Sequence, residues 1–312
     1  MPVWYMGQLS VRRAMHIVSV QPETADDDLF ARFTRAFEEH VARKNGQGFV
    51  YVFGHPCRWG AQRWWGQDQW EDYRAGKIIC PDQLQPPREP YTAAQIDRLM
   101  DQTDRCLAWV ASRRHLTPTT YAELNAACAE PKMQWLTDDA LRRAAAEVAE
   151  TFTYVALPET TLSPADLLAA LVWRLTHASP GLIPVRRPLG PLSEPAAARE
   201  PLEISREAAA PLSRRLDDEI EKTGAIPAKL TLSAADLGPA DLLRLAAQAV
   251  AEPERNPLRV PPGPALPAIV DAQCFQETRF NSWSYPEGFD PKFLVALARW
   301  QSWTFRPAVA KW

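Results

Sequence analysis

A short motif occurs twice in the second half of the sequence, as LSPADLL at residues 162–168 and as LGPADLL at residues 237–243. In each copy a proline stands in the first turn of a predicted helix, where its missing N–H costs nothing. An apolar run follows, Leu167–Leu175 in one copy and Leu242–Val250 in the other, and a weaker third copy begins at Phe289. One helix pair of this size cannot bury its apolar face alone, so we expect the copies to stack as helical repeats.

A charged amphipathic helix is predicted before each of the first two motifs, over residues 138–150 and 213–222. Gly224 follows the second of these helices at the position of a C-cap. The expected unit is therefore a helix, a proline turn, a short extended link and a second helix. The alternative is that Pro-Ala-Asp recurs only because proline and an early acidic residue suit any helix start.

Proline is concentrated between Pro180 and Pro267. We interpret Pro180–Pro211 and Pro253–Pro267 as semi-rigid spacers between the repeats. These features predict four parts of the chain: an α/β domain at residues 1–135, a first helical repeat at 136–190, a linker with a second repeat at 191–265, and a degenerate third repeat at 266–312.

The first part has the pattern of an α/β unit. Apolar residues three and four apart within Ala25–Ala42 predict an amphipathic helix, with three aspartates near its start. A glycine turn comes next, and Phe49–Phe53 is a short apolar run typical of a buried strand. Another helix is predicted over Tyr91–Arg113, with an apolar stripe that includes Met100 and Leu107.

A long loop rich in tryptophan follows the predicted strand. Ligands of parallel sheets bind at the carboxyl ends of the strands, which is where His55 and this loop would lie. An imidazole can donate a proton near neutral pH, although a histidine there could also simply hydrogen-bond a loop. The aromatic rings could stack on sugars or pack the loop onto its scaffold, and both interpretations stay open. The candidate substrate-binding residues are Trp59, Trp64, Trp65, Trp70 and Tyr73.

The order of these features resembles a known family. Residues 54–59 read GHPCRW, the tryptophan-rich loop leads to Pro86 and Pro87, and the segments Leu107–Val110 and Tyr121–Leu124 follow. Over about residues 1–130 this order is similar to the carboxyl-terminal half of the polysaccharide deacetylases. The resemblance implies a partial (β/α) barrel that removes acetyl groups from carbohydrate by a metal-assisted mechanism, with His55 as the catalytic acid for the departing amine.

The metal-binding motifs of that family are missing from this sequence. It contains no Thr-Phe-Asp-Asp segment and no His-x-x-x-His pair, whereas a hydrolytic metal typically needs three converging protein ligands. We therefore assign no metal ligand and no cofactor to this chain. A divalent metal such as zinc is expected only if the missing half of the barrel is supplied, for example by a partner chain; otherwise the chain is interpreted as a fragment.

The second half resembles the pseudomurein-binding repeat, a small helical module that binds cell walls. The resemblance rests on the pattern Glu-Lys-x-Gly-x-x-Pro at residues 221–227, followed by the Pro-Ala-Asp-Leu-Leu motif. It covers about residues 138–260, with a degenerate copy that extends to residue 309. The partner that it implies is carbohydrate, a cell-wall glycan.

Together the two resemblances imply a polysaccharide deacetylase-like hydrolase of acetylated cell-wall glycan, incomplete or inactive on its own. The alternative is a non-catalytic glycan-binding protein of the cell wall. The formal net charge is -3, so nucleic acid is not expected as a partner, because a phosphate backbone is bound by an excess of Lys and Arg. No apolar run is long enough to cross a bilayer. Met1–Val20 lacks the pattern of a secretory signal, so the localisation stays open although the resemblance implies the cell surface.

Overall fold

The computed structural model describes most of the chain. The described residues are 2–6, 8–11, 17–42, 49–61, 89–130, 134–158, 160–177, 181–233, 235–267 and 290–309. They form a mixed α/β structure whose sheets have two or three strands each. They fall into two compact units. Within these ranges no helix is both long enough and apolar enough to span a membrane.

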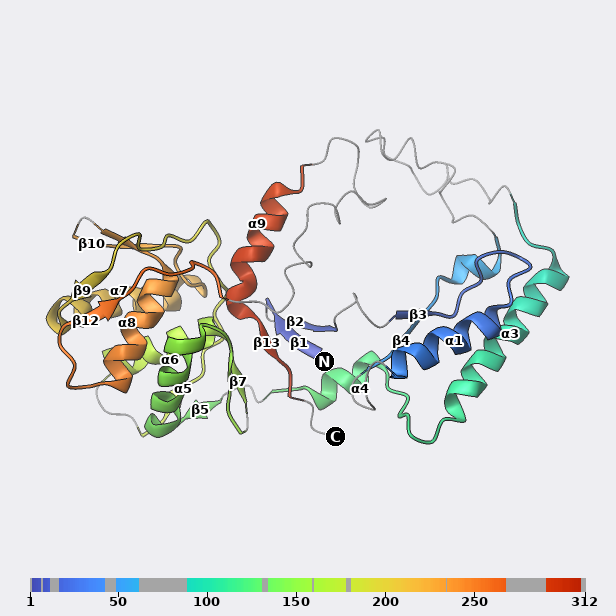
Figure 1. Ribbon diagram of the computed structural model, residues 1–312, viewed down its shortest axis with the longest axis horizontal. Helices are drawn as coiled ribbons and strands as arrows, with labels where there is room; N and C mark the ends of the chain where they lie inside the picture. The colour runs from blue at the N-terminus through green and yellow to red at the C-terminus, as the bar shows by residue number, and fades with distance from the viewer. Residues whose placement is uncertain are drawn as a thin grey trace. The chain divides into compact units, whose positions relative to one another are not determined.

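The first unit, which contains the described residues from 17 to 121, is built on a strand, a helix and a second strand (Figure 1). Strands β3 and β4 pair in parallel, and α1 lies between them in the chain. The helix and the strand predicted here are therefore confirmed. The elements of this unit are β3 (Ile17–Ser19), α1 (Leu29–Ala42), β4 (Tyr51–Phe53), the short 3-10 helix η2 (Pro56–Trp59) and α3 (Ala93–Ala111).

Helix α1 begins where a side chain satisfies its first backbone donors. The carboxylate of Asp28 accepts a hydrogen bond from the N–H of Ala31 at 3.1 Å, which is the usual role of an aspartate at an N-cap. Leu29, Phe33 and Phe37 then fall on one face and are buried. This face packs against α3 and closes a small core.

Helix α3 packs with a different face from the one predicted. Its start is as expected, because Thr92 forms a capping box with Gln95. Leu99 and Cys106 are fully buried, whereas Met100 and Leu107, expected on the apolar stripe, are 46% and 49% exposed. The prediction of the stripe was thus wrong at these two positions, since the core of this unit accepts a narrower face of α3.

Strand β4 was predicted to be buried, and this is also wrong. Val52 is 37% exposed, and Tyr51 and Phe53 on either side are half-buried. The only strand that pairs with β4 among the described residues is β3, and no closed barrel is formed by the sheets of these residues. A two-stranded sheet has only α1 and its neighbours to cover it, so part of the strand stays in contact with solvent.

The second unit contains two copies of one structural pattern (Figure 1). Each copy runs strand, helix, two-stranded hairpin, helix, strand, and its outer strands pair antiparallel. We name residues 135–184 repeat 1 and residues 202–260 repeat 2. Repeat 1 contains β5 (Trp135–Leu136), α5 (Asp138–Thr151), β6 (Val155–Ala156), β7 (Thr161–Leu162), α6 (Pro164–Thr176) and β8 (Ile183–Pro184). Repeat 2 contains β9 (Leu202–Ile204), α7 (Arg206–Thr223), β10 (Leu230–Leu232), β11 (Ala235–Leu237), α8 (Pro239–Ala251) and β12 (Leu258–Val260).

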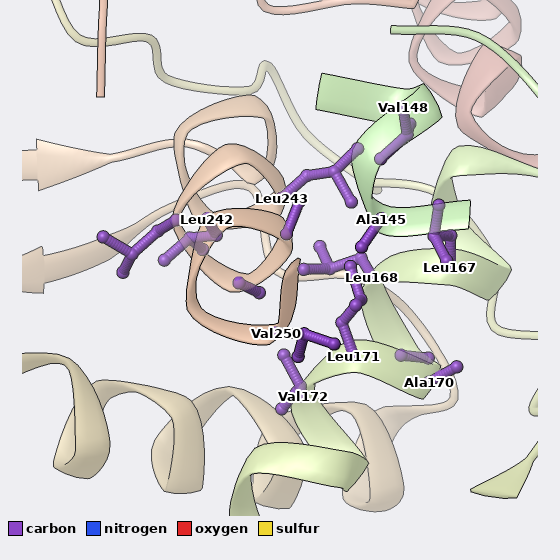
Figure 2. Packing of buried hydrophobic residues seen from close by; sticks show 14 of the residues in the cluster. Ala145, Val148, Leu167, Leu168, Ala170, Leu171, Val172, Leu242, Leu243 and Val250 are labelled. Atoms are coloured by element: carbon purple, nitrogen blue, oxygen red, sulfur yellow. The ribbon is translucent and has the colours of Figure 1, made fainter. Parts of the chain in front are cut away.

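The two repeats pack against each other mainly through helices from opposite repeats. The first helix of each repeat packs mainly against the second helix of the other, α5 against α8 and α7 against α6, while α6 and α8 also pack against each other. Figure 2 shows Leu168 and Leu171 of α6 facing Leu243 and Val250 of α8, all of them buried. Burial of one such side chain stabilises the fold by about 1.5–3 kcal/mol. The central position of α6 and α8 explains why both are apolar on nearly every face.

The proline-rich segment before repeat 2 is only partly a spacer. Helix α7 begins at Arg206 and contains Pro211, so the predicted start of this helix at residue 213 was too late. Upstream, the backbone of Leu189 exchanges hydrogen bonds with Gly224 and Ile226, and Gly224 has the positive φ of 68° expected at a C-cap. The part of this segment around Leu189 therefore packs against repeat 2.

The two ends of the described chain meet in this unit. Strand β1 pairs antiparallel with both β2 and β13, although β1 was expected in the amino-terminal α/β domain. Of the predicted third copy at residues 266–312, the described part contains one helix, α9, followed by a 3-10 turn and a strand. The remaining elements of the described chain are β1 (Pro2–Tyr5), β2 (Gln8–Val11), α4 (Tyr121–Ala127), α9 (Lys292–Trp300), η7 (Gln301–Thr304) and β13 (Arg306–Pro307).

Candidate functional site

His55 lies directly after β4, at the carboxyl ends of the two parallel strands. Its backbone N–H donates to the side-chain oxygen of Gln21 at 2.7 Å, and Gln21 follows β3. The imidazole ring meets the ring of Phe53 edge-on, with the ring centroids 4.5 Å apart. The fold therefore brings the ends of both strands together around His55, as expected for a residue at this edge of a parallel sheet.

Trp59 is used for packing. Its ring lies so close to Gly54 that a Cβ atom there would approach the Cη2 atom of the indole to 2.5 Å. The indole N–H donates to the hydroxyl of Thr103 on α3 at 2.7 Å. Trp59 thus fastens η2 to α3, in agreement with the scaffold interpretation of this ring. Four other candidate substrate-binding residues lie outside the described residues: Trp64, Trp65, Trp70 and Tyr73.

An ion pair holds the segment that precedes α1. Arg32 donates to the carbonyl oxygen of Gln21 at 2.7 Å and pairs with Asp27 at 2.6 Å. Burial raises the pKa of Asp27, but hydrogen bonds from Arg32 and from the backbone N–H of Glu23 outweigh it and leave this pKa below its ordinary value. Within the described ranges, no three His, Cys, Asp or Glu side chains are grouped to hold a metal. The described residues beside His55 therefore do not form a metal-binding group by themselves.

In the second unit, the aspartate of the repeated Pro-Ala-Asp motif does more than start a helix. Asp166 and Asp241 are the equivalent residues, and both are buried. Each accepts a hydrogen bond at 2.9 Å from the backbone N–H of the residue that caps its own helix. Asp241 also accepts a bond of 2.9 Å from the backbone N–H of Ala198, in the segment before repeat 2. The motif therefore starts a helix in both repeats, and in repeat 2 its aspartate also anchors a second segment.

Asp166 anchors other parts of the chain through arginines. Arg187 pairs with Asp166 at 2.5 Å, and Arg306 of β13 lies 3.3 Å from the same carboxylate. Arg306 is only 6% exposed in its side chain and forms a two-pronged ion pair with Glu130, at 2.5 and 2.7 Å. The two carboxylates thus balance the charges of the two arginines. The residues of this network are Glu130, Asp166, Arg187 and Arg306. A network of this kind is costly to break at one member, since it leaves a buried charge without its partner.

A groove of about 800 Å³ lies beside repeat 2. Residues 194–200 and Leu202 form one wall, and Lys229, Ala235 and Asp236 form the other. Lys229 pairs with Asp236 at 2.7 Å, and the hydrogen bonds from Lys229 and Thr231 lower the pKa of that carboxyl. Concave surfaces of this size are typical of ligand sites. The groove is thus the second candidate site.

The sequence reasoning missed this groove, although one signal for it was present. The motif has Ser163 before its proline in repeat 1 and Gly238 in repeat 2. A Cβ atom at Gly238 would collide with the backbone carbonyl of Ala196. The glycine therefore marks the place where another segment crosses the helix start, and that segment is one wall of the groove.

Comparison of the chain with protein-family models, with curated proteins and with solved structures found no match.

Proposed function

We propose that this chain is a glycan-binding protein of the cell wall and that its duplicated unit is the binding part. The observation that carries the proposal is the repetition in space: repeats 1 and 2 have the same order of elements and the same strand pairings. The same part of the chain, residues 138–260, carries the resemblance to a wall-binding repeat, and that resemblance is the second support for the proposal. Repeated modules commonly present extended binding surfaces to long polymers.

Co-sedimentation with insoluble wall material tests this function. The full chain is mixed with pseudomurein, with peptidoglycan and with cellulose as the control polymer, and the bound fraction is measured against the amount of polymer. We expect saturable binding to a wall polymer and none to cellulose. Equal, unsaturable binding to all three materials, or no binding to any, would contradict the proposal.

A second candidate function is the deacetylase-like hydrolysis of acetylated wall glycan. The observation that favours it is the place of His55 after β4, beside β3 and Gln21. An imidazole there would be positioned to protonate a departing amine. The described residues do not supply a metal site, so this activity requires ligands from elsewhere, for example from a partner chain that supplies the first half of a barrel.

Release of acetate from acetylated chito-oligosaccharide, with and without added zinc, tests the second candidate. The variant His55→Ala is compared with His115→Ala, whose exposed imidazole lies far along the chain from β4. Hydrolysis that is lost only in His55→Ala would support the catalytic role. Absence of acetate release from the parent chain under every condition would leave the non-catalytic function.

A further inference from the structure

Trp135 in repeat 1 is the most exposed tryptophan of the described residues. It is 47% exposed, whereas the others are half-buried or buried. Within the described ranges its ring meets no aromatic or cationic side chain, and its indole N–H donates to no acceptor. The other described tryptophans all use the ring or the N–H in an internal contact: Trp4, Trp59, Trp109, Trp173, Trp300 and Trp303.

The indole lies on the outer face of the ribbon formed by β5 and β8. Trp135 is directly opposite Pro184, and the next pair is Leu136 with Ile183. Leu136 and Ile183 are buried, and successive side chains of a strand point to opposite faces, so Trp135 and Pro184 point outward. Leu182, on the other side of Ile183, is 51% exposed. We name Trp135, Leu182 and Pro184 the outer patch.

Repeat 2 shows that the fold does not require an apolar pair at this place. Trp135 stands two residues before the residue that caps α5, and Glu203 stands two residues before the cap of α7. Glu203 is directly opposite Arg259, and the two form an exposed ion pair at 2.9 Å. Exposed pairs of this kind add little to stability. Packing therefore does not explain why repeat 1 has a tryptophan where repeat 2 has a solvated charge.

The size of the outer patch suits a single ring of a ligand. A whole tryptophan side chain has a surface of about 250 Å², so the exposed part of Trp135 is about 120 Å². Leu182 and Pro184 extend this area only slightly. A stable protein interface needs about 800 Å² per partner, which is several times more. A sugar ring has one apolar C–H face with hydroxyls around it, and it matches a flat indole whose N–H is still available.

Polar groups suited to a sugar follow Trp135 in the chain. Thr137 is exposed, and its hydroxyl oxygen accepts the N–H of Ala140 at 3.2 Å, so its own proton remains available to donate. Asp139 is exposed and forms no ion pair or hydrogen bond with another described residue. A carboxylate accepts hydrogen bonds from hydroxyls and from the N–H of an acetamido group. An N-acetylated sugar therefore offers more to this surface than a plain glucose unit does.

From these observations we infer that Trp135 is a stacking platform for one ring of an N-acetylated glycan, with Thr137 and Asp139 as its hydrogen-bonding neighbours. The inference rests on the proposed wall-binding function and names the residue of repeat 1 that contacts the sugar chain. Repeat 2 has no such platform at the equivalent position, because Glu203 and Arg259 occupy it.

Titration of the full chain with penta-N-acetylchitopentaose tests the inference, by calorimetry and by NMR of isotope-labelled indole groups. The Trp135 signal is the one that is absent from Trp135→Leu. We expect this signal to shift saturably with the sugar, and cellopentaose to bind at least tenfold more weakly.

Three variants separate a flat ring from mere apolar surface. Trp135→Leu keeps an apolar side chain without a ring and should weaken binding at least tenfold, whereas Trp135→Phe keeps a ring and should stay within about threefold of the parent. The matched control Phe293→Leu removes another exposed aromatic ring, which lies outside the outer patch, and should bind like the parent. All three variants should keep the parent's Tm to within about 2 °C, because the replaced side chains are exposed.

The outcomes separate this inference from the proposed function. If wall polymer sediments the parent and Trp135→Leu equally, and chitopentaose does not move the Trp135 signal, the platform is wrong and the wall-binding function stands. If chitopentaose binds through Trp135 but wall polymer does not sediment the chain, the platform stands and the proposed function is wrong. Self-association that is lost in Trp135→Leu, without any sugar binding, would assign the outer patch to a second copy of the chain and overturn the inference.

Discussion

The substitution Gly238→Ser tests whether the segment before repeat 2 is anchored as described. Serine is the residue found at the equivalent position of repeat 1, and it is a better N-cap than glycine by a few tenths of a kcal/mol. The φ of Gly238 is -85°, so its backbone conformation suits any residue. On helix capping alone the substitution should therefore stabilise the protein slightly. The structure gives the opposite sign, because the new Cβ collides with the backbone of Ala196.

The size of the loss follows from the two hydrogen bonds that anchor this segment. Ala198 bonds to the buried carboxylate of Asp241, and a bond to a charged group contributes about 1.5–3 kcal/mol. Ala196 bonds to the carbonyl of Ala228, which contributes about 0.5–1.5 kcal/mol. We expect the free energy of unfolding to fall by about 3 kcal/mol in total. For a unit of this size, that corresponds to a fall in Tm of about 6–12 °C.

Thermal unfolding and amide hydrogen exchange measure this effect. Gly238→Ser should lower the Tm and remove the protection of the Ala196 and Ala198 amides. The reciprocal variant Ser163→Gly changes the same cap in repeat 1, so it should cost only a few tenths of a kcal/mol and leave both amides protected. A Gly238→Ser protein as stable as the parent, with both amides still protected, would refute the reasoning.

Three further predictions concern buried or paired groups. Arg306→Ala should lower the free energy of unfolding by about 3–5 kcal/mol, because two carboxylates lose a buried cation; a urea midpoint equal to the parent's would contradict the ion-pair network. Hydrogen bonds from Arg174 and Arg142 lower the pKa of Asp138 below its ordinary value of 3.8. The ionised Asp138 therefore stabilises the fold above pH 3.8, and this stabilisation is lost as the pH falls through the lower pKa of the folded state. Asp138→Asn should therefore be less stable than the parent at pH 7, and the difference should shrink during acid unfolding; a constant difference would be inconsistent with this pairing. Burial raises the pKa of Cys106 to about 11, so iodoacetamide at pH 8 should modify the half-buried Cys57 before the buried Cys106; faster labelling of Cys106 in the native chain would contradict its burial.

The helices of the second unit could be predicted from the sequence because local chemistry determines them. A proline with an acidic residue two positions later starts both α6 and α8, and Gly224 ends α7 with a positive φ. Apolar periodicity also located α1 and α5. These signals depend on neighbours within one or two helical turns, and a single sequence contains them in full.

The parts that could not be predicted depend on distant segments. Nothing near Val3 indicates that β1 pairs with β13 at the other end of the chain. Met100 has the spacing of a core residue, yet the first unit packs a narrower face of α3 and leaves it exposed. The groove arises from a crossing of two segments, of which the sequence shows only Gly238 in place of Ser163.

The exchange of helix partners between the two repeats also bears on their origin. A lone copy of this unit would lack the helices against which its own two helices mainly pack, and it could obtain them by associating with an identical copy about a two-fold axis. Duplication and fusion of the gene of such a homodimer would produce the present arrangement. Joining the subunits frees them to diverge, so that one half can retain an open cleft while the other accepts a strand from its own polypeptide.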